Sequence, residues 1–407
     1  MLRLPYTARW LAVAAACMLA APGTLPAQAK PVEKAAPKPG EKPAEKPTEK
    51  MTPKPEEKPT TPPTTPAPEA VKIEEEKLGF NSADGVELQG RLYKSVKGGG
   101  SSSVILLHSV GKDPNNGDWH GLATTLATEG FNVLRFDFRG HGRSTQFDKV
   151  FWNPDYINAH AFPALFKKKP LPEKIEMKDV QNAKGYYLPT LANDVMAARI
   201  ALDKLNDSGQ TNTGSTYLIG STDAAGIGLF YMVAEWTRPQ TVAQAHNPTT
   251  YPPRPWEVPV NADFAGKDIV GAIWLSPMLP RGIEPSVMRK WISPTGLGFT
   301  GLRDKNAIYC LYGADDAAGK AVSNTIVNEV FEAKAKDRTK NPLAFTKMEA
   351  IPNTKAVGVD LLGKQLGTED KILKYLKSLE DDRKKVITVN RNYTKPGILI
   401  PSAFGVK

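Results

Sequence analysis

Residues 217–230 of this 407-residue chain, YLIGSTDAAGIGLF, place three oxygen-bearing side chains at one sharp turn. An apolar, strand-forming run leads into Ser221, Thr222 and Asp223, and a run of small and apolar residues typical of a helix follows. A hydroxyl at the tip of such a turn could act as a nucleophile if a neighbouring base takes up its proton. That chemistry also needs an acid and a base from elsewhere in the chain.

The acid has two candidates and the base has none in the expected place. Asp315 and Asp316 follow the apolar run NAIYCLYG, which predicts a buried strand. The segment after the last predicted strand reads AIPNTKAVGVDLLG and contains no histidine. All five histidines of the chain precede Asp315, and they are His108, His120, His141, His160 and His246.

Alternating strand and helix patterns must position these residues. Two strands around the turn at Asp84-Gly85 are followed by apolar runs at 103–110, 131–138, 215–220, 268–277, 306–313 and 344–352. Helical patterns begin near 118, 191, 223 and 368. This alternation predicts an α/β domain over residues 71–385, in which helices cover both faces of a mostly parallel sheet.

Two inserts interrupt the alternation, at residues 145–190 and 238–266, and both read as irregular. Ligands of open α/β sheets bind at the carboxyl ends of the strands, so we expect both inserts to form a cap there. The tail over residues 386–407 has no assigned structure.

Four segments resemble the α/β-hydrolase fold, which includes serine esterases, lipases and peptidases of the S9 and S33 type. They are LLHSVG at the oxyanion-hole loop, RFDFRGHGRS at a strand exit, LIGSTDAAG at the nucleophile elbow and LYGADD at the acid strand. The resemblance covers about residues 72–383 and implies the α/β-hydrolase fold.

Aligning the elbow pattern G-x-S-x-G on Gly220 implies that Thr222 stands at the nucleophile position. Ser221 or Asp223 could serve only with a shift of one residue. A β-branched residue at positive φ costs of order 1–3 kcal/mol. Thr222 therefore predicts either a relaxed elbow or a poor nucleophile in a costly conformation.

The resemblance implies Asp316 as the acid and places the His-Gly step of the family on Val357-Gly358. Valine accepts no proton, so the standard triad cannot be assembled. A base from an insert, His160 or His246, is the alternative, whereas His108 and His141 match positions of structural histidines.

The resemblance also implies an altered oxyanion hole, with the backbone amides of Val110 and Asp223 as its donors. A carboxylate at Asp223 would oppose a developing oxyanion unless it turned away or were protonated. Asp223 can instead serve as a helix-starting residue, because a carboxylate is favourable beside free amides at a helix N-terminus.

The first 70 residues predict export and a tether. Arg3, Arg9, the apolar run 10–21 and the small residues at 27–29 are typical of a secretory signal peptide over residues 1–29. Residues 30–70 hold 12 of the 35 prolines and regularly spaced lysines, which predicts a disordered, polyproline-like linker. We expect a periplasmic, secreted or cell-envelope protein, with envelope association through the linker.

Composition excludes several classes. The net charge of +10 comes from dispersed lysines, and we read the short cluster Lys167–Lys169 as a solvated loop, so no nucleic-acid partner is expected. The chain has no CxxC, HExxH or P-loop pattern, so no metal or cofactor is expected. Of two cysteines, Cys17 lies in the signal peptide and Cys310 on a strand expected to be buried.

Three functions remain open. The favoured one is a degenerate hydrolase homologue that binds a small molecule or peptide in its cleft, because the nucleophile serine and the base histidine are both missing. The second is an active ester or amide hydrolase with a rearranged site. The third is an envelope scaffold without enzymatic activity.

Overall fold

The computed structural model describes residues 73–154, 156–184, 187–244, 256–293, 300–332, 346–383 and 398–406. The predicted signal peptide and linker over residues 1–70 lie outside these ranges, as does His246. Among the described helices, none is both long and apolar enough to cross a membrane.

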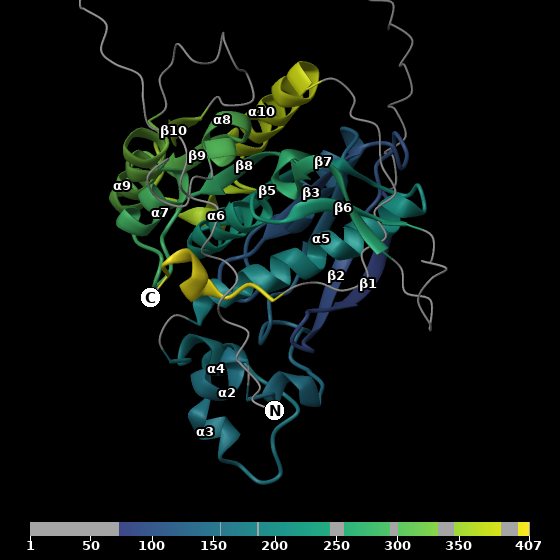
Figure 1. Cartoon of the computed structure of the whole chain (residues 1–407). Coiled ribbons are helices and arrows are strands. Elements are labelled where there is room, and N and C mark those ends of the chain that lie inside the picture. The colour runs from purple at the N-terminus through teal and green to yellow at the C-terminus, as the bar shows by residue number, and fades with distance from the viewer. Residues whose placement is uncertain are drawn as a thin grey trace, which may run out of the picture. The chain divides into compact units, whose positions relative to one another are not determined.

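An eight-stranded sheet forms the centre of the domain, in the order β1-β2-β4-β3-β5-β8-β9-β10 (Figure 1). The strands are β1 (Glu75–Asn81), β2 (Glu87–Tyr93), β3 (Ser102–Leu107), β4 (Asn132–Phe136), β5 (Asn212–Ser221), β8 (Ile269–Leu275), β9 (Ala307–Gly313) and β10 (Lys347–Ile351). Strand β2 pairs antiparallel with both neighbours, and all other pairs are parallel. The predicted mostly parallel sheet is confirmed.

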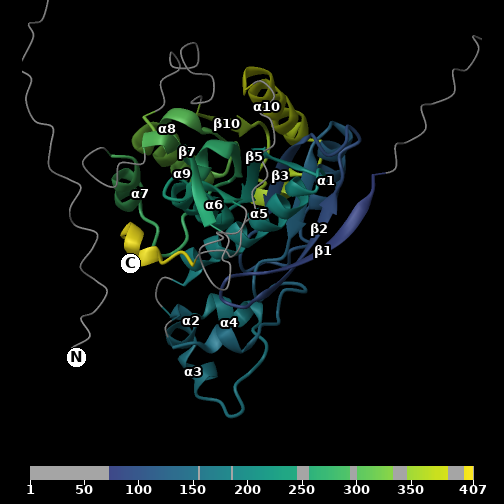
Figure 2. The same cartoon turned by 45° about the vertical axis from the view of Figure 1, so that its right-hand side comes forward.

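Helices cover both faces of this sheet, as predicted (Figure 2). One face carries α1 (Trp119–Thr128) and α10 (Thr368–Arg383), and the other carries α5 (Ala192–Asp207), α6 (Asp223–Glu235), α7 (Pro285–Ile292) and α9 (Ala317–Asn324). Along β3, Val104 and Leu106 pack toward α1, while Ile105 and Leu107 pack toward α5 and α6. Side chains alternate between faces along a strand, so a fully apolar strand fills both cores.

The first insert is a small helical lobe at the carboxyl ends of the strands. It contains η1 (Lys149–Trp152), α2 (Ile157–Ala161), α3 (Pro163–Phe166), α4 (Met177–Gln181) and η2 (Leu188–Leu191). Stacked rings of Phe147 and Phe151, 4.0 Å apart at their centroids, form part of its core. Gln181 donates to the backbone oxygen of Gly111, 3.2 Å away, and so joins the lobe to the loop after β3.

The second insert differs from its prediction in structure and in place. Its described residues form an antiparallel pair, β6 (Pro239–Gln244) and β7 (Trp256–Phe264), where an irregular segment was expected. It leaves the end of α6 and returns through η3 (Ala265–Asp268) to the start of β8. Because α6 begins at the carboxyl end of β5, this insert begins and ends at the amino ends of the strands, opposite the expected cap position.

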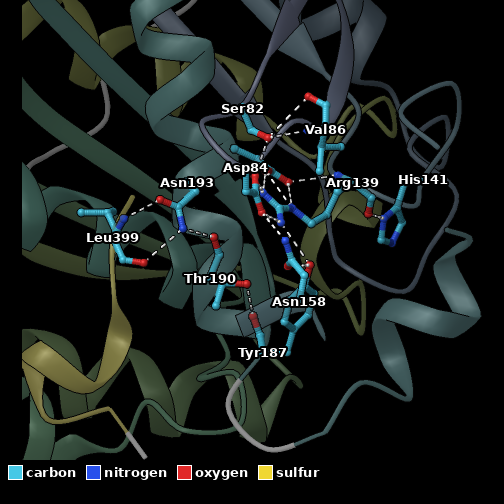
Figure 3. A network of polar contacts seen from close by, with 11 residues as sticks. Ser82, Asp84, Val86, Arg139, His141, Asn158, Tyr187, Thr190, Asn193 and Leu399 are labelled. Carbon is cyan, nitrogen blue, oxygen red and sulfur yellow. Dashed lines mark hydrogen bonds and ion pairs between the residues drawn. The ribbon is translucent and has the colours of Figure 1, made fainter. Parts of the chain in front are cut away.

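A buried ionic network ties the first insert to the sheet (Figure 3). The fully buried Arg139 guanidinium donates to Asp84 (2.6 Å), to Asp194 on α5 (2.6 Å) and to the Tyr187 hydroxyl (3.0 Å). Asn158 on α2 donates to Asp84 and accepts from Tyr187. The guanidinium of Arg139 therefore joins four segments, which are the exit of β4, the β1–β2 turn, α5 and the first insert.

The described end of the chain packs against the helical face. Leu399 exchanges two hydrogen bonds with the Asn193 side chain, at 2.7 and 3.3 Å (Figure 3). The backbone oxygen of Phe404, in η8 (Pro401–Phe404), accepts from the Trp291 indole of α7, and Val406 is fully buried. Residues 398–406 are called the C-terminal strap below.

Other sequence predictions fall within the described residues. Cys310 is fully buried in β9, and burial raises the pKa of its thiol to about 12, so the residue serves as a small core side chain. Lys167, Lys168 and Lys169 are exposed in the loop after α3, as expected of a solvated loop.

Candidate active site

The elbow is present in its strained form. Thr222 is the single residue between β5 and α6, with φ 51° and ψ −120°. Its backbone is fixed from both sides, because its N–H donates to Leu275 and its carbonyl accepts from Met278, each at 2.9 Å. Of the two alternatives, the structure therefore shows the costly conformation and not a relaxed turn.

The Thr222 hydroxyl is engaged by oxygen atoms. Its Oγ1 lies 2.6 Å from the Ser109 hydroxyl, 2.9 Å from the Ser221 carbonyl and 3.2 Å from Oδ1 of Asp223. Ser109 donates in turn to the same carboxylate oxygen at 3.1 Å. Only 5% of Thr222 is exposed. The hydroxyl thus begins a short hydrogen-bonded chain that ends on a carboxylate.

The Asp223 side chain takes one donor of the expected oxyanion hole. Its Oδ1 accepts the backbone N–H of Val110 at 2.9 Å, the amide expected to be the first oxyanion donor. Burial raises the pKa of Asp223, while the hydrogen bonds from Val110 and Ser109 lower it. Asp223 does begin α6, as expected, but its carboxylate is not turned away from the oxyanion loop.

Asp316 faces inward, and its neighbour Asp315 is exposed. Asp316 is the N-cap of α9, where Oδ1 accepts the Gly319 N–H at 2.8 Å. Its Oδ2 is buried and has no hydrogen-bond partner among the described residues. The acid candidate therefore has a structural role, with one carboxylate oxygen left over.

The segment after β10 passes over the elbow. Gly358 has φ +61°, and a Cβ added there would lie 2.5 Å from Oγ of Ser221 and 2.6 Å from Cγ2 of Thr222. The segment around Val357-Gly358 therefore lies beside the elbow, where the resemblance places the His-Gly step. The side chain of Val357 has no polar atom, and the Ser221 hydroxyl is fully buried with no partner among the described residues.

Two histidines near the elbow form hydrogen bonds to backbone groups through both ring nitrogens. His108 Nδ1 donates to the Ser109 carbonyl at 2.9 Å, since its Nε2 accepts from Phe138. His141 Nδ1 donates to the Arg139 carbonyl, and its Nε2 accepts from Gly111. Burial lowers both pKa values, that of His108 to about 3, so both rings are neutral near pH 7 and their nitrogens are occupied.

The remaining histidines show no bond to the elbow. His120 is exposed on α1 and contacts the Tyr93 hydroxyl at 3.1 Å. His160 is exposed on α2 in the first insert. His246 lies outside the described residues. Within the described part of the chain, no histidine nitrogen is hydrogen-bonded to Thr222 or to Ser221.

Sequence reasoning missed the role of Ser109. The resemblance to the α/β-hydrolase fold places Ser109 where the family often has glycine and gives its hydroxyl no role. In the structure its hydroxyl links the Thr222 hydroxyl to the Asp223 carboxylate. The signal was available, because Ser109 precedes the expected donor Val110 and can reach whatever occupies the oxyanion site.

Strand β5, which leads into the elbow at Thr222 and then into α6, lies in the middle of a mostly parallel sheet. Only β2 runs against the other strands of that sheet. The chain has the α/β-hydrolase fold. No protein-family model matches this sequence, and no curated protein matches it either.

Solved structures of α/β-hydrolases resemble this chain. An esterase of Pyrococcus furiosus has 16% identity and a TM-score of 0.41, covering 75% of this chain and 91% of its own. A dienelactone hydrolase of Anabaena variabilis has 10% identity and a TM-score of 0.41, covering 77% and 99%. The protein Est1E of Butyrivibrio proteoclasticus, solved with ferulic acid, has 14% identity and a TM-score of 0.42, covering 75% and 99%. At such values the likeness concerns the fold alone.

Among the residues that the structure describes, no three histidine, cysteine, aspartate or glutamate side chains gather as a metal would require.

Proposed function

We propose that this protein is an exported, catalytically inactive member of the α/β-hydrolase fold that acts by binding a small molecule or peptide. The observation that carries the proposal is the hydrogen bond from the Val110 amide to the Asp223 carboxylate. An oxyanion hole stabilises negative charge that develops on a substrate oxygen. In this protein the Asp223 carboxylate already accepts the hydrogen bond of the Val110 amide, which would otherwise be free for a substrate oxygen.

The same carboxylate cannot both serve as a base and leave the hole open. Asp223 Oδ1 lies 3.2 Å from the Thr222 hydroxyl, within reach of its proton. As long as that oxygen holds the Val110 amide, a carbonyl attacked by Thr222 would find its oxyanion site filled by negative charge. With Val357 at the base position, two parts of the mechanism are missing together.

Export and tethering complete the proposal. The signal-like segment over residues 1–29 supports delivery across a membrane, and the proline-rich residues 30–70 support a spacer between the envelope and the domain. Cell fractionation of the producing organism tests this part. Recovery of the protein in the cytoplasm with an intact N-terminus would contradict it.

Inactivity is tested with purified protein, short p-nitrophenyl esters and a fluorophosphonate probe, beside Thr222→Ala, Ser221→Ala and Ser109→Ala variants. We expect no turnover above the rate of these variants and no labelling, with circular dichroism showing folded protein in each case. Turnover or labelling that disappears in one variant would establish the alternative, an active hydrolase with a rearranged site, and would identify its nucleophile.

Binding is tested by thermal unfolding in the presence of short peptides and of acyl esters that the protein does not cleave. A ligand at about 100 times its Kd stabilises the folded state by about 2.7 kcal/mol, which raises the melting temperature by a few degrees. A melting temperature unchanged across such a panel would favour the third function, a scaffold without a ligand.

A further inference from the structure

A cavity lies at the end of the sheet opposite the elbow. Its volume is about 340 Å³, and it opens between the amino ends of β3 and β5 and the last turn of α10. Its lining includes Lys97, Ser102, Asn212, Tyr217, Glu380 and Arg383. This site is independent of the proposed function, because neither Thr222 nor Asp223 contributes to it.

Tyr217 supplies the wall with an unused donor. The residue is fully buried on β5, its ring packs edge-on against Phe131 at 5.9 Å, and its hydroxyl has no hydrogen-bond partner among the described residues. Burial, and then the negative charge of Glu380, raise the pKa of this hydroxyl, so it remains protonated at neutral pH. A buried donor without an acceptor is destabilising, and a bound acceptor would remove that cost.

Charges of both signs line the same cavity. The Arg383 guanidinium is held at the wall by the carbonyls of Gly214 and Lys267, at 2.6 and 2.9 Å. Glu380 is half-buried one turn earlier on α10 and accepts from Ser102; burial raises its pKa. A carboxylate and a guanidinium on one wall suit a ligand that carries both an anionic and a cationic group.

We propose that this cavity binds a small zwitterion of the α-amino acid class. The ligand carboxylate accepts from the Tyr217 hydroxyl and faces Arg383, and its ammonium group faces Glu380. The volume is near the lower end of the range for ligand pockets, which fits a small molecule. A sugar fits less well, because Tyr217 is the one aromatic residue among the described lining residues, and it is fully buried and offers no open ring face.

Isothermal titration of the full chain with the common amino acids tests this proposal. The amino acid that binds most tightly is then compared with three other compounds. These are the carboxylic acid that lacks its amino group, the amine that lacks its carboxyl group, and glucose. We expect at least one amino acid to bind with a Kd below about 1 mM and each matched compound to bind at least tenfold more weakly. Failure of every amino acid to bind, or equal binding of the acid, the amine or glucose, would overturn the proposal.

Tyr217→Phe removes only the hydroxyl, and Tyr231→Phe is its matched control. The Tyr231 hydroxyl on α6 is also buried without a partner among the described residues, but it does not line the cavity. We expect Tyr217→Phe to weaken binding at least tenfold, Glu380→Gln to weaken binding of the zwitterion more than that of its acid, and Tyr231→Phe to bind as the unmodified protein does. Equal affinity of Tyr217→Phe and Tyr231→Phe would refute the site.

Discussion

At the scale of single residues, the contacts of one oxygen atom, Oδ1 of Asp223, determine the chemistry of the elbow. Oδ1 of Asp223 accepts from the Val110 amide at 2.9 Å and from the Ser109 hydroxyl at 3.1 Å, and the Thr222 hydroxyl, which donates to Ser109, lies 3.2 Å away. Burial disfavours the ionised form of Asp223, and the hydrogen bonds to its carboxylate stabilise it. The balance between these effects determines how the site responds to pH.

Asp223→Asn tests that balance. Because the pKa of Asp223 is raised in the folded state, its contribution to stability declines as pH rises from the unfolded value near 3.9 through the higher folded value. Asparagine keeps an acceptor for Val110 but has no charge. We expect the variant to melt at a higher temperature than the unmodified protein at pH 7, and the difference to vanish below the unfolded pKa. Melts across pH check this, and a difference that does not change with pH would contradict it.

Gly358→Ala tests the contact between the last loop and the elbow. The added methyl would meet Ser221 and Thr222 at about 2.5 Å, in a backbone with φ +61°. Gly367→Ala is the matched control, because its φ is +72° and nothing lies within 4 Å of the added atom. We expect Gly358→Ala to lose about 1–3 kcal/mol more in free energy of unfolding than the control. Equal losses in urea unfolding would show that the loop does not cover the elbow.

At the scale of elements, Arg139 holds four segments together. It joins the exit of β4 to the β1–β2 turn, to α5 and to the first insert through Asp84, Asp194 and Tyr187. Burial raises the pKa of Asp194, although Arg139 opposes this, whereas the pKa of Asp84 is lowered by Arg139 against the effect of burial. One guanidinium thus serves two carboxylates, and its removal would leave both without a cation.

Arg139→Met is therefore expected to cost about 3–5 kcal/mol in free energy of unfolding. Arg91→Met is the control, because Arg91 pairs with Glu75 on the surface, where such a pair contributes about 0–1 kcal/mol. Urea titration monitored by tryptophan fluorescence measures both. A loss for Arg139→Met no larger than that of the control would show that the network does not stabilise the insert against the sheet.

Most of the sheet and its long helices followed from sequence patterns. Periodicity and end signals are local, so Asp118 as the N-cap of α1 and the apolar run of β3 predicted their elements directly. Helix α7 and the pairing of β6 with β7 were missed, since short elements among prolines carry little periodicity. The second insert was placed at the wrong end because its position depends on the direction of α6.

The candidate site was predictable in position but not in orientation. Gly220 and the following residues indicated the elbow, and the missing histidine was visible at Val357. The bond from Val110 to Asp223 joins residues 113 positions apart in the chain, so no local pattern specifies it. The positive φ of Thr222 was foreseen only as one of two alternatives, since tertiary hydrogen bonds decide whether such strain persists.

At the scale of the whole molecule, the C-terminal strap closes the helical face. Phe404 packs against Phe230 of α6 with ring centroids 5.2 Å apart, and Val406 is fully buried. Asn193 pairs with both backbone groups of Leu399. Residues remote in sequence thereby complete the core around α5, α6 and α7.

Removal of residues 398–407 is expected to lower the free energy of unfolding by about 2–5 kcal/mol, since large apolar side chains lose their cover. Ile400→Ala is the control, because Ile400 is 60% exposed and should change stability by less than about 0.5 kcal/mol. Differential scanning calorimetry measures both proteins. A truncated chain with the same melting temperature as the unmodified protein would show that the strap does not contribute to the core.

The bond between Asp223 and Val110 also bears on evolutionary reversibility. On the proposed function, a histidine regained at position 357 would bring no advantage while a carboxylate fills the oxyanion site. Loss of that carboxylate would bring none while no base exists. On that proposal, neither change alone would restore catalysis, so a return to activity would need both together. The hydrogen bond of 2.9 Å would then act as an evolutionary ratchet.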